Sequence, residues 1–392
     1  MTRIGILLSA ESFEQFFEGE LGLDADSFVA GYRNDWSWGY CRALAARGIE
    51  PLVYVASTGQ SGLRRTTDGF GVRFLPLGRA YTPWARIPAL KRSPPGRYVA
   101  QAVGAATLLG PLRRAVAEDG VDVLFVQEYW TARFDLLALR LETPLIAVDQ
   151  GMPDRREVKL LKRRTLPRAS AVVTQTGREA EKTRRYGARA VQMPNGIDTA
   201  RYAPEASVAR EPGLIVCVAR LENAQKRQSD VIRALARLDS TWHLELVGTG
   251  PDEQRLRALA RELGVAGRVT FTGFLADEDA VRERYRRCTV FVLASEFEGL
   301  PLALLEAMSC GAPPVGTDIP AIAEAIEHGV NGRLVPPRTP DRLAEAIVAA
   351  AGHGEQYSRA ARAAIVERFS VERMGAELER LVHAAKELAT DR

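Results

Sequence analysis

Short apolar runs rich in Val, Ile and Leu recur along the chain, each followed by a polar or glycine-containing turn and then a stretch of helical periodicity. This pattern is typical of βα units on a parallel sheet, whose strands are apolar throughout because helices cover both faces. The first half predicts strands at 4–8, 51–56, 72–77, 122–127, 144–149 and 171–176. The second half predicts strands at 213–219, 243–248, 268–273, 289–294 and 313–317. We therefore expect two consecutive α/β domains with parallel sheets, divided between Pro194 and Pro212.

Two stretches of the first half interrupt this rhythm. Residues 9–34 form a long predicted loop that carries the aromatic residues Phe13, Phe16, Phe17 and Tyr32 among six acids, and loops of that length are usually functional or disordered. Residues 64–97 are rich in arginine and contain one acid, Asp68. A basic stretch of this kind, like the basic helix predicted at 157–164, suits either a solvated face or contact with an anionic lipid surface, and the solvated face is favoured.

The composition is that of a globular protein of 392 residues, with 46% hydrophobic and 26% charged residues. No window is apolar enough for a membrane span or a signal-peptide core, so we expect a cytoplasmic protein. The four cysteines are widely spaced, which predicts buried thiols rather than a disulfide framework or a metal site. A net charge of +4 is too small to indicate a nucleic-acid partner.

Ligands of open α/β sheets bind beyond the carboxyl ends of the strands, so the residues that follow each strand are the candidates for chemistry. In the second half, Arg220 ends one strand and Lys226 lies six residues further on, a pair of cations suited to a diphosphate. Only 6 of the 53 basic residues are lysines, which favours a specific role for Lys226. Gly248 and Gly250 follow the next strand and permit a tight turn with close approach of the backbone to a ligand.

The strand at 289–294 is followed by Glu298, Gly299 and Leu300, and Pro301 is predicted as the first residue of a helix. The free N–H groups of a helix start favour phosphate. Glu306 lies eight residues after Glu298, too far along for the two to be paired acids on one helical face. We expect them to accept hydrogen bonds from hydroxyl groups on either side of a diphosphate, a sugar on one side and a ribose on the other.

At these residues the sequence resembles the retaining glycosyltransferases of family 4, which have the GT-B fold. Glu298 and Glu306 match the family's pair of glutamates within EGLPLALLEAM, and Arg220 with Lys226 matches its diphosphate-binding pair. The turns at 194–198 and 248–251, the segments at 269–275 and 322–336, and RFS at 368–370 are similar as well. The resemblance covers roughly residues 120–380.

The resemblance implies a fold of two Rossmann-like parallel-sheet domains facing across a cleft. Residues 1–196 form the expected acceptor-binding domain, with the helix at 373–392 packed back on it, and residues 197–372 the nucleotide-sugar domain. The implied enzyme is a hexosyltransferase that uses a nucleotide-sugar, UDP or GDP, and requires no metal or other cofactor. The implied catalytic residues are Glu298, Arg220 and Lys226, and the implied donor-binding residues are Arg220, Lys226, Gly248, Phe274, Leu275, Glu298, Gly299, Leu300 and Glu306.

One departure concerns the first domain, where the family places a His after the strand at 144–149 and this chain has Gln150. The missing His leaves two alternatives open: an epimerase or coupling enzyme of the same fold, and a non-catalytic nucleotide-sugar-binding subunit. The aromatic loop suits stacking on the apolar faces of sugar or cyclitol rings, and its acids suit a small polyhydroxylated acceptor, with or without an amine. The candidate acceptor-binding residues are Phe13, Phe16, Phe17, Tyr32 and Gln150.

Overall fold

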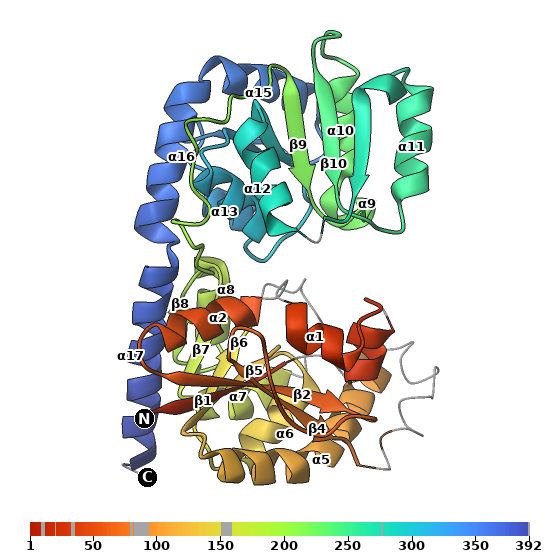
Figure 1. Ribbon diagram of the computed structural model, residues 1–392. Helices are drawn as coiled ribbons and strands as arrows, with labels where there is room; N and C mark the ends of the chain where they lie inside the picture. Colours follow the sequence, from red (N-terminus) through yellow and green to blue (C-terminus); the bar gives the residue numbers. More distant parts are fainter. Residues whose placement is uncertain are drawn as a thin grey trace. The chain divides into compact units, whose positions relative to one another are not determined.

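The computed structural model describes residues 1–8, 12–19, 21–32, 36–78, 81, 94–149, 159–275 and 277–390. It divides into two compact units: an N-terminal unit of Met1–Pro194 with Met374–Arg392, and a C-terminal unit of Asn195–Arg373. Figure 1 shows that the chain leaves the first unit once and returns to it through the last helix.

The N-terminal unit is built on a sheet with the strand order β3-β4-β2-β1-β5-β6-β7-β8. Its neighbouring strands pair in parallel except β3, which pairs antiparallel with β4. The strands are β1 (Arg3–Leu7), β2 (Glu50–Ser57), β3 (Gly62–Arg65), β4 (Gly71–Pro76), β5 (Val123–Gln127), β6 (Leu145–Val148), β7 (Ala171–Thr174) and β8 (Ala190–Gln192). The helices are a π-helical turn η1 (Glu14–Glu18), α1 (Ala25–Gly31), α2 (Trp36–Ala45), α5 (Pro94–Asp119), α6 (Ala132–Arg140), α7 (Lys159–Thr165), the 3₁₀ turn η2 (Leu166–Arg168), α8 (Gly177–Arg184) and α17 (Val371–Thr390).

The C-terminal unit is built on a parallel sheet with the order β11-β10-β9-β12-β13-β14. Its strands are β9 (Leu214–Val218), β10 (His243–Val247), β11 (Val269–Gly273), β12 (Val290–Leu293), β13 (Pro314–Thr317) and β14 (Arg333–Val335). Its helices are α9 (Asn223–Lys226), α10 (Gln228–Leu235), α11 (Glu253–Glu262), the 3₁₀ turn η3 (Ala266–Arg268), α12 (Glu278–Arg287), α13 (Leu302–Ser309), α14 (Pro320–Ala323), α15 (Pro340–Gly352) and α16 (Gly354–Arg368).

Strand β9 shows why these runs are apolar throughout. Ile215 and Cys217 pack on one face with residues of α10 and α15, whereas Leu214 and Val216 pack on the other face with residues of α13 and α16. Successive side chains of a strand point to opposite faces, so a strand between two helical layers has no position for a polar residue. The two α/β units and their parallel strands confirm the predicted fold class.

Each strand predicted from the sequence is present, whereas β3, β8 and β14 were not predicted. All three lie at a sheet edge and are short and partly exposed, so they lack the continuous apolar run by which the others are recognised. Pro301 also differs slightly from the prediction, because α13 begins at Leu302 and Pro301 is its N-cap. The four cysteines are free and buried, as expected.

Candidate functional site

The strand order of the C-terminal unit defines one position at the carboxyl edge where a ligand is expected. From β9 the chain moves outward through β10 to β11, and then returns to the other side of β9 to form β12. The loops after β9 and β12 therefore leave the sheet in opposite directions, and open α/β sheets bind their ligands at such a switch point. The sequence places Lys226 in the first of these loops and Glu298 in the second.

Lys226 and Glu298 form an ion pair across this switch point. The Lys226 Nζ lies 2.7 Å from Oε1 and 2.8 Å from Oε2 of Glu298. The Ser295 hydroxyl donates a further hydrogen bond of 2.5 Å to the same carboxylate. The two charged side chains are only 18% and 6% exposed, so both are held in place with little solvent screening. A cation and an acceptor of hydroxyl hydrogen bonds are thus fixed side by side at the switch point.

Arg220 is not part of this pair. Its side chain is 65% exposed, and its guanidinium lies 3.8 Å from the carboxylate of Glu222. Its backbone carbonyl is fixed by a 2.7 Å hydrogen bond from the Gln228 side chain. The structure therefore brings Lys226 and Glu298 together and leaves the Arg220 head group in solvent.

The residues between Glu298 and α13 offer two backbone donors. Neither the Gly299 nor the Leu300 N–H donates a hydrogen bond to another residue in the described part of the chain. They precede the first turn of α13, whose own N–H groups also lack partners within the helix. Leu300 itself is buried beneath the turn. Backbone N–H groups arranged in this way at the start of a helix commonly bind anions.

Glu306 has a separate environment on the same helix. Its Oε2 accepts a 2.9 Å hydrogen bond from the Tyr285 hydroxyl of α12, which is fully buried. Burial raises the pKa of the Glu306 carboxyl to about 7, although hydrogen bonds from Tyr285 and Tyr202 act in the opposite direction. The two glutamates thus have different partners, because Glu298 faces a lysine and Glu306 faces tyrosines. This difference is consistent with two separate roles, which remain predictions.

The structure explains why glycines follow β10, which the sequence alone did not reveal. A Cβ on Gly248 would lie 2.2 Å from the Ala219 carbonyl oxygen, and one on Gly250 would lie 2.3 Å from that of Leu221. Their missing side chains allow the turn after β10 to pack against the backbone after β9. Gly248 therefore allows the turns after β9 and β10 to pack closely together by their backbones. Phe274 is 61% exposed after β11, while Leu275 is partly buried.

The predicted acceptor loop is packed inward, which corrects the assignment of two of its residues. Phe13 and Phe17 are each 1% exposed, and both pack on Phe28 of α1. Rings buried in an aromatic core cannot stack on a ligand. Phe16 is 37% exposed, and Tyr32 stacks on Phe28 with a centroid distance of 5.4 Å. Of the predicted aromatic residues, Phe16 has the exposure that an acceptor contact requires.

Glu14 anchors the same segment to the sheet. Its carboxylate accepts hydrogen bonds from the Ser57 hydroxyl and from the Thr58 and Gly59 N–H groups at 2.9 Å, all at the end of β2. Burial raises the pKa of Glu14, but these hydrogen bonds outweigh it and lower the pKa to about 2. Residues 12–19 are therefore a fixed structural element rather than a solvated insertion. Gln150, the remaining predicted acceptor residue, lies outside the described residues.

Comparison with known proteins assigns each half of the chain to a glycosyltransferase model. The model described as Glycosyltransferase Family 4 matches residues 38–201, and that described as Glycosyl transferases group 1 matches residues 212–353. The two matches together span both units.

Similar proteins include three with assigned names. A lipopolysaccharide 1,6-galactosyltransferase of Salmonella typhimurium is 37% identical over 32% of this chain and 36% of its own length. A GDP-mannose-dependent alpha-(1-6)-phosphatidylinositol monomannoside mannosyltransferase of Mycobacterium tuberculosis is 31% identical over 40% of this chain and 45% of its own. A D-inositol 3-phosphate glycosyltransferase of Acidothermus cellulolyticus is 34% identical over 46% and 45%. The chain thus spans less than half the length of each of these relatives.

Two solved structures share the fold over nearly the whole chain. Sucrose-phosphate synthase of Thermosynechococcus elongatus has a TM-score of 0.77 at 18% identity and covers 100% of both chains. Anabaena HepE, solved with UDP-glucose, has a TM-score of 0.72 at 18% identity over 98% of this chain and 100% of its own. Within the described residues, no helix combines the length and apolarity needed to cross a bilayer.

Proposed function

The chain belongs to the family 4 glycosyltransferases of GT-B fold, and from this premise we propose that it transfers a hexosyl group from a nucleoside diphosphate sugar to a hydroxyl group of a polyhydroxylated acceptor. The observation that carries the proposal is the pair of Lys226 and Glu298 at the switch between β9 and β12, beside the two N–H groups of Gly299 and Leu300. Few other chemistries call for a buried cation, a carboxylate and free backbone donors at one switch point.

In the proposed reaction the bond between the anomeric carbon and the distal phosphate oxygen breaks, and the acceptor oxygen bonds to that carbon on the same face. The acceptor proton passes to the departing phosphate oxygen, and the nucleoside diphosphate leaves. Lys226, Arg220 and the N–H groups of Gly299 and Leu300 stabilise the charge that grows on the diphosphate. The configuration of the donor is retained, and no residue forms a covalent intermediate.

The two glutamates are assigned to opposite ends of the donor. Glu298 accepts hydrogen bonds from the hydroxyls of the transferred sugar, and Glu306 accepts them from the ribose. Phe274 and Leu275 lie near the base. UDP is the proposed nucleotide because HepE, which shares the fold, has been solved with UDP and UDP-glucose. Because side-chain cations and backbone N–H groups stabilise the charge on the diphosphate, the reaction requires no divalent metal. EDTA is therefore expected to leave turnover unchanged.

The acceptor is proposed as a polyol on the evidence of the relatives. Their names specify lipopolysaccharide, a phosphatidylinositol mannoside and D-inositol 3-phosphate, and all three are rich in hydroxyl groups. An epimerase or a non-catalytic subunit is not favoured by these relatives. Release of UDP that increases when a polyol is added distinguishes transfer from both.

The test is calorimetry with UDP alone, followed by turnover of UDP-glucose, for the wild type, Glu298→Gln and Glu306→Gln. Glu298→Gln is expected to bind UDP as the wild type does while losing turnover about tenfold or more, because a charge-assisted hydrogen bond to the sugar contributes about 1.5–3 kcal/mol. Glu306→Gln is expected to weaken the binding of UDP itself. Equal losses of UDP affinity in both variants would contradict the assignment of Glu298 to the sugar. A wild-type protein that binds neither UDP, GDP nor their sugars would contradict the proposed function as a whole.

A further inference from the structure

Each unit contains a buried pair of a lysine and a carboxylate at the switch point of its sheet. In the N-terminal unit, Lys162 pairs with Asp135 below the turn after β5, and β5 lies across β1 from β2. In the C-terminal unit, Lys226 pairs with Glu298. In both pairs a buried hydroxyl group also donates to the carboxylate, at 2.5 Å. The two pairs therefore have the same kind of support and can be compared contact by contact.

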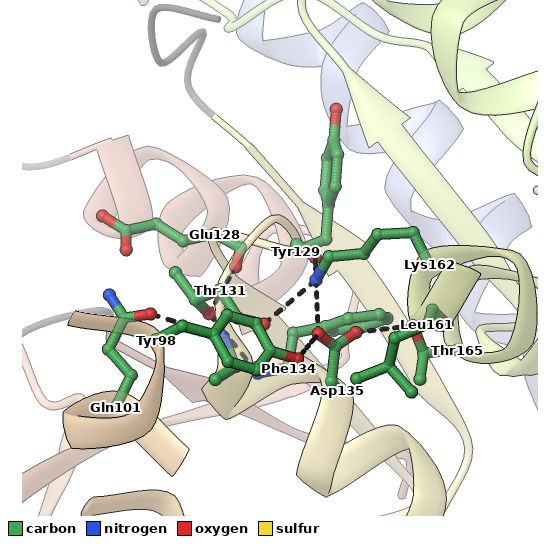
Figure 2. A network of polar contacts seen from close by, with 11 residues as sticks. Tyr98, Gln101, Glu128, Tyr129, Thr131, Phe134, Asp135, Leu161, Lys162 and Thr165 are labelled. Atoms are coloured by element: carbon green, nitrogen blue, oxygen red, sulfur yellow. Dashed lines mark hydrogen bonds and ion pairs between the residues drawn. The ribbon is translucent and has the colours of Figure 1, made fainter. Parts of the chain in front are cut away.

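The pair in the N-terminal unit has no donor left for a ligand. Lys162 is 0% exposed, and its Nζ donates to the carbonyls of Tyr129 at 2.7 Å and Thr131 at 3.1 Å. It also donates at 2.8 Å to Asp135, which accepts from two further hydroxyl groups, among them that of Thr165. Figure 2 shows these groups gathered around Lys162 and Asp135. An ammonium group has three donors, so this pair is a closed structural network.

The pair in the C-terminal unit keeps capacity for a ligand. Within the described residues, the Lys226 Nζ donates to Glu298 and makes no other hydrogen bond. Glu298 Oε1 accepts from both Lys226 and the Ser295 hydroxyl, whereas Oε2 accepts from Lys226 alone. A carboxylate oxygen can accept two hydrogen bonds, so Oε2 is the oxygen with room for a hydroxyl group of a ligand.

Ser295 has a fixed position at the edge of the sheet. It lies two residues after β12 and is fully buried. Its carbonyl accepts a 2.5 Å hydrogen bond from the hydroxyl of Thr317. Thr317 is the last residue of β13, which pairs with β12, and it is 2% exposed. The Ser295 hydroxyl is therefore held relative to the sheet itself.

Other contacts fix the backbone of the same loop without touching the carboxylate of Glu298. The Glu296 N–H donates to the Gln225 carbonyl at 2.7 Å, and the Gln225 side chain donates to the Phe297 carbonyl at 3.3 Å. The Glu296 carboxylate also pairs with Arg338 at 2.9 Å. Because a glutamate side chain rotates about three bonds, a fixed backbone does not orient its carboxylate. That orientation depends on the side chains that donate to it.

We propose that Ser295 is a positioning residue, whose hydroxyl holds Oε1 of Glu298 so that Oε2 is presented to the hydroxyl groups of the donor sugar, and that Thr317 holds Ser295 in turn. The inference rests on the proposed function and deepens it, because it names what orients the sugar-binding carboxylate. In the proposed reaction Lys226 also serves the diphosphate. Of the two side chains that donate to Glu298, Ser295 is the one whose support does not depend on the donor.

The experiment uses the full chain and the donor that the wild type turns over fastest among UDP-glucose, UDP-galactose and GDP-mannose. Turnover is measured as release of nucleotide in the presence of methyl α-glucoside and myo-inositol, and the affinity for the free nucleotide by calorimetry. Ser295→Ala is expected to lower kcat about tenfold, because the carboxylate loses the hydrogen bond that orients it. Nucleotide affinity is expected to stay within twofold of the wild type, because the nucleotide end of the donor is untouched.

Thr317 provides a second variant that leaves Ser295 in place. Thr317→Val keeps the shape of the side chain and removes the hydroxyl, and it is expected to lower kcat about threefold with unchanged nucleotide affinity. Thr317→Ser keeps the hydroxyl and is expected to restore the wild-type kcat. These two variants decide the question if circular dichroism shows that Ser295→Ala does not fold.

Thr165→Val is the matched control, because it removes the buried hydroxyl that donates at 2.5 Å to the other ion pair. It is expected to lower the urea midpoint of unfolding but to leave kcat and nucleotide affinity within twofold of the wild type. A double variant tests the route of the effect. Ser295→Ala added to Glu298→Gln is expected to lower kcat by less than twofold, because the charge that Ser295 orients is already gone.

The possible failures are distinguishable. A folded Ser295→Ala protein with the wild-type kcat overturns the role of Ser295, while turnover by the wild type leaves the proposed function standing. Loss of nucleotide affinity equal to the loss of kcat also overturns it, because Ser295 would then support the whole site. A full tenfold loss in the double variant overturns it as well, since the effect would not pass through Glu298. A wild type that binds neither nucleotide and turns over no donor contradicts the proposed function itself.

Discussion

The two sheets of this protein each have a switch point, and they differ in what the chain places there. In the C-terminal unit, loops after β9 and β12 bring Lys226 onto Glu298 at 2.7 Å, beside two backbone N–H groups without partners in the described chain. In the N-terminal unit, the buried Lys162 donates to the carbonyls of the turn after β5 and to Asp135. A cation with free N–H groups suits the doubly charged diphosphate, whereas Lys162 has no donor left for a ligand.

The comparison also separates aromatic residues by their role. The phenylalanines after β1 resemble a binding surface in sequence, but Phe13 and Phe17 pack in the core of the N-terminal unit. In the C-terminal unit, Phe274 after β11 is 61% exposed. The position after a strand therefore does not by itself place a ring in a binding site.

The largest expected effect is on stability, and it tests whether Phe13 and Phe17 belong to the core. Phe13→Ala and Phe17→Ala are each expected to lower the free energy of unfolding by about 3–5 kcal/mol, because each removes a fully buried ring and leaves a cavity. Urea denaturation monitored by fluorescence measures the change. Phe16→Ala, which alters a ring that is 37% exposed and touches only the edge of the core at Phe17, serves as control and is expected to change stability by less than about 1 kcal/mol. Phe13→Ala with wild-type stability and a raised acceptor KM would restore the discarded acceptor assignment.

The next largest effect is on catalysis, and it compares Lys226 with Arg220 at the switch point of the C-terminal sheet. Lys226→Ala is expected to lower kcat/KM for UDP-glucose about a hundredfold, because it removes a diphosphate contact and leaves the buried Glu298 carboxylate without its cation. Arg220→Ala is expected to cost about tenfold, since its exposed guanidinium is better screened by solvent. Steady-state kinetics on variants with unchanged circular dichroism measure both. Should Arg220→Ala prove the more damaging, donor binding would have to reorganise this loop.

The smallest effect concerns Glu306. Burial raises the pKa of its carboxyl to about 7, and the ionised form is the one that accepts hydrogen bonds from ribose hydroxyls. Binding of UDP therefore favours ionisation and lowers this pKa, so UDP affinity is expected to be greatest above pH 7. Affinity is expected to fall between pH 8 and pH 5, by up to about tenfold for each unit by which UDP lowers the pKa.

Calorimetry across this pH range measures the slope, and Glu306→Gln provides the control because an amide does not titrate. An equally steep slope in that variant would assign the titration to another group, such as the phosphate of UDP itself. A flat profile in the wild type would show that Glu306 does not contact the nucleotide.

The sequence determined the two parallel sheets and the places of the candidate donor residues after their strands, because the physical signals for both are local. A strand covered on two faces must be apolar throughout, and Lys226, Glu298 and Glu306 lie at fixed distances from such strands along the chain. The same reasoning placed Phe13 and Phe17 in a loop, but it could not state which way their rings point.

Tertiary structure alone decided that those rings turn into the core, that Gly248 is required by the Ala219 carbonyl, and that Lys226 rather than Arg220 reaches Glu298. It also decided the position of Ser295, whose carbonyl is held by the Thr317 hydroxyl, 22 residues away in sequence. Each of these facts is a contact between segments distant along the chain. No local pattern encodes such a contact, because it exists only once the sheet has brought the segments together.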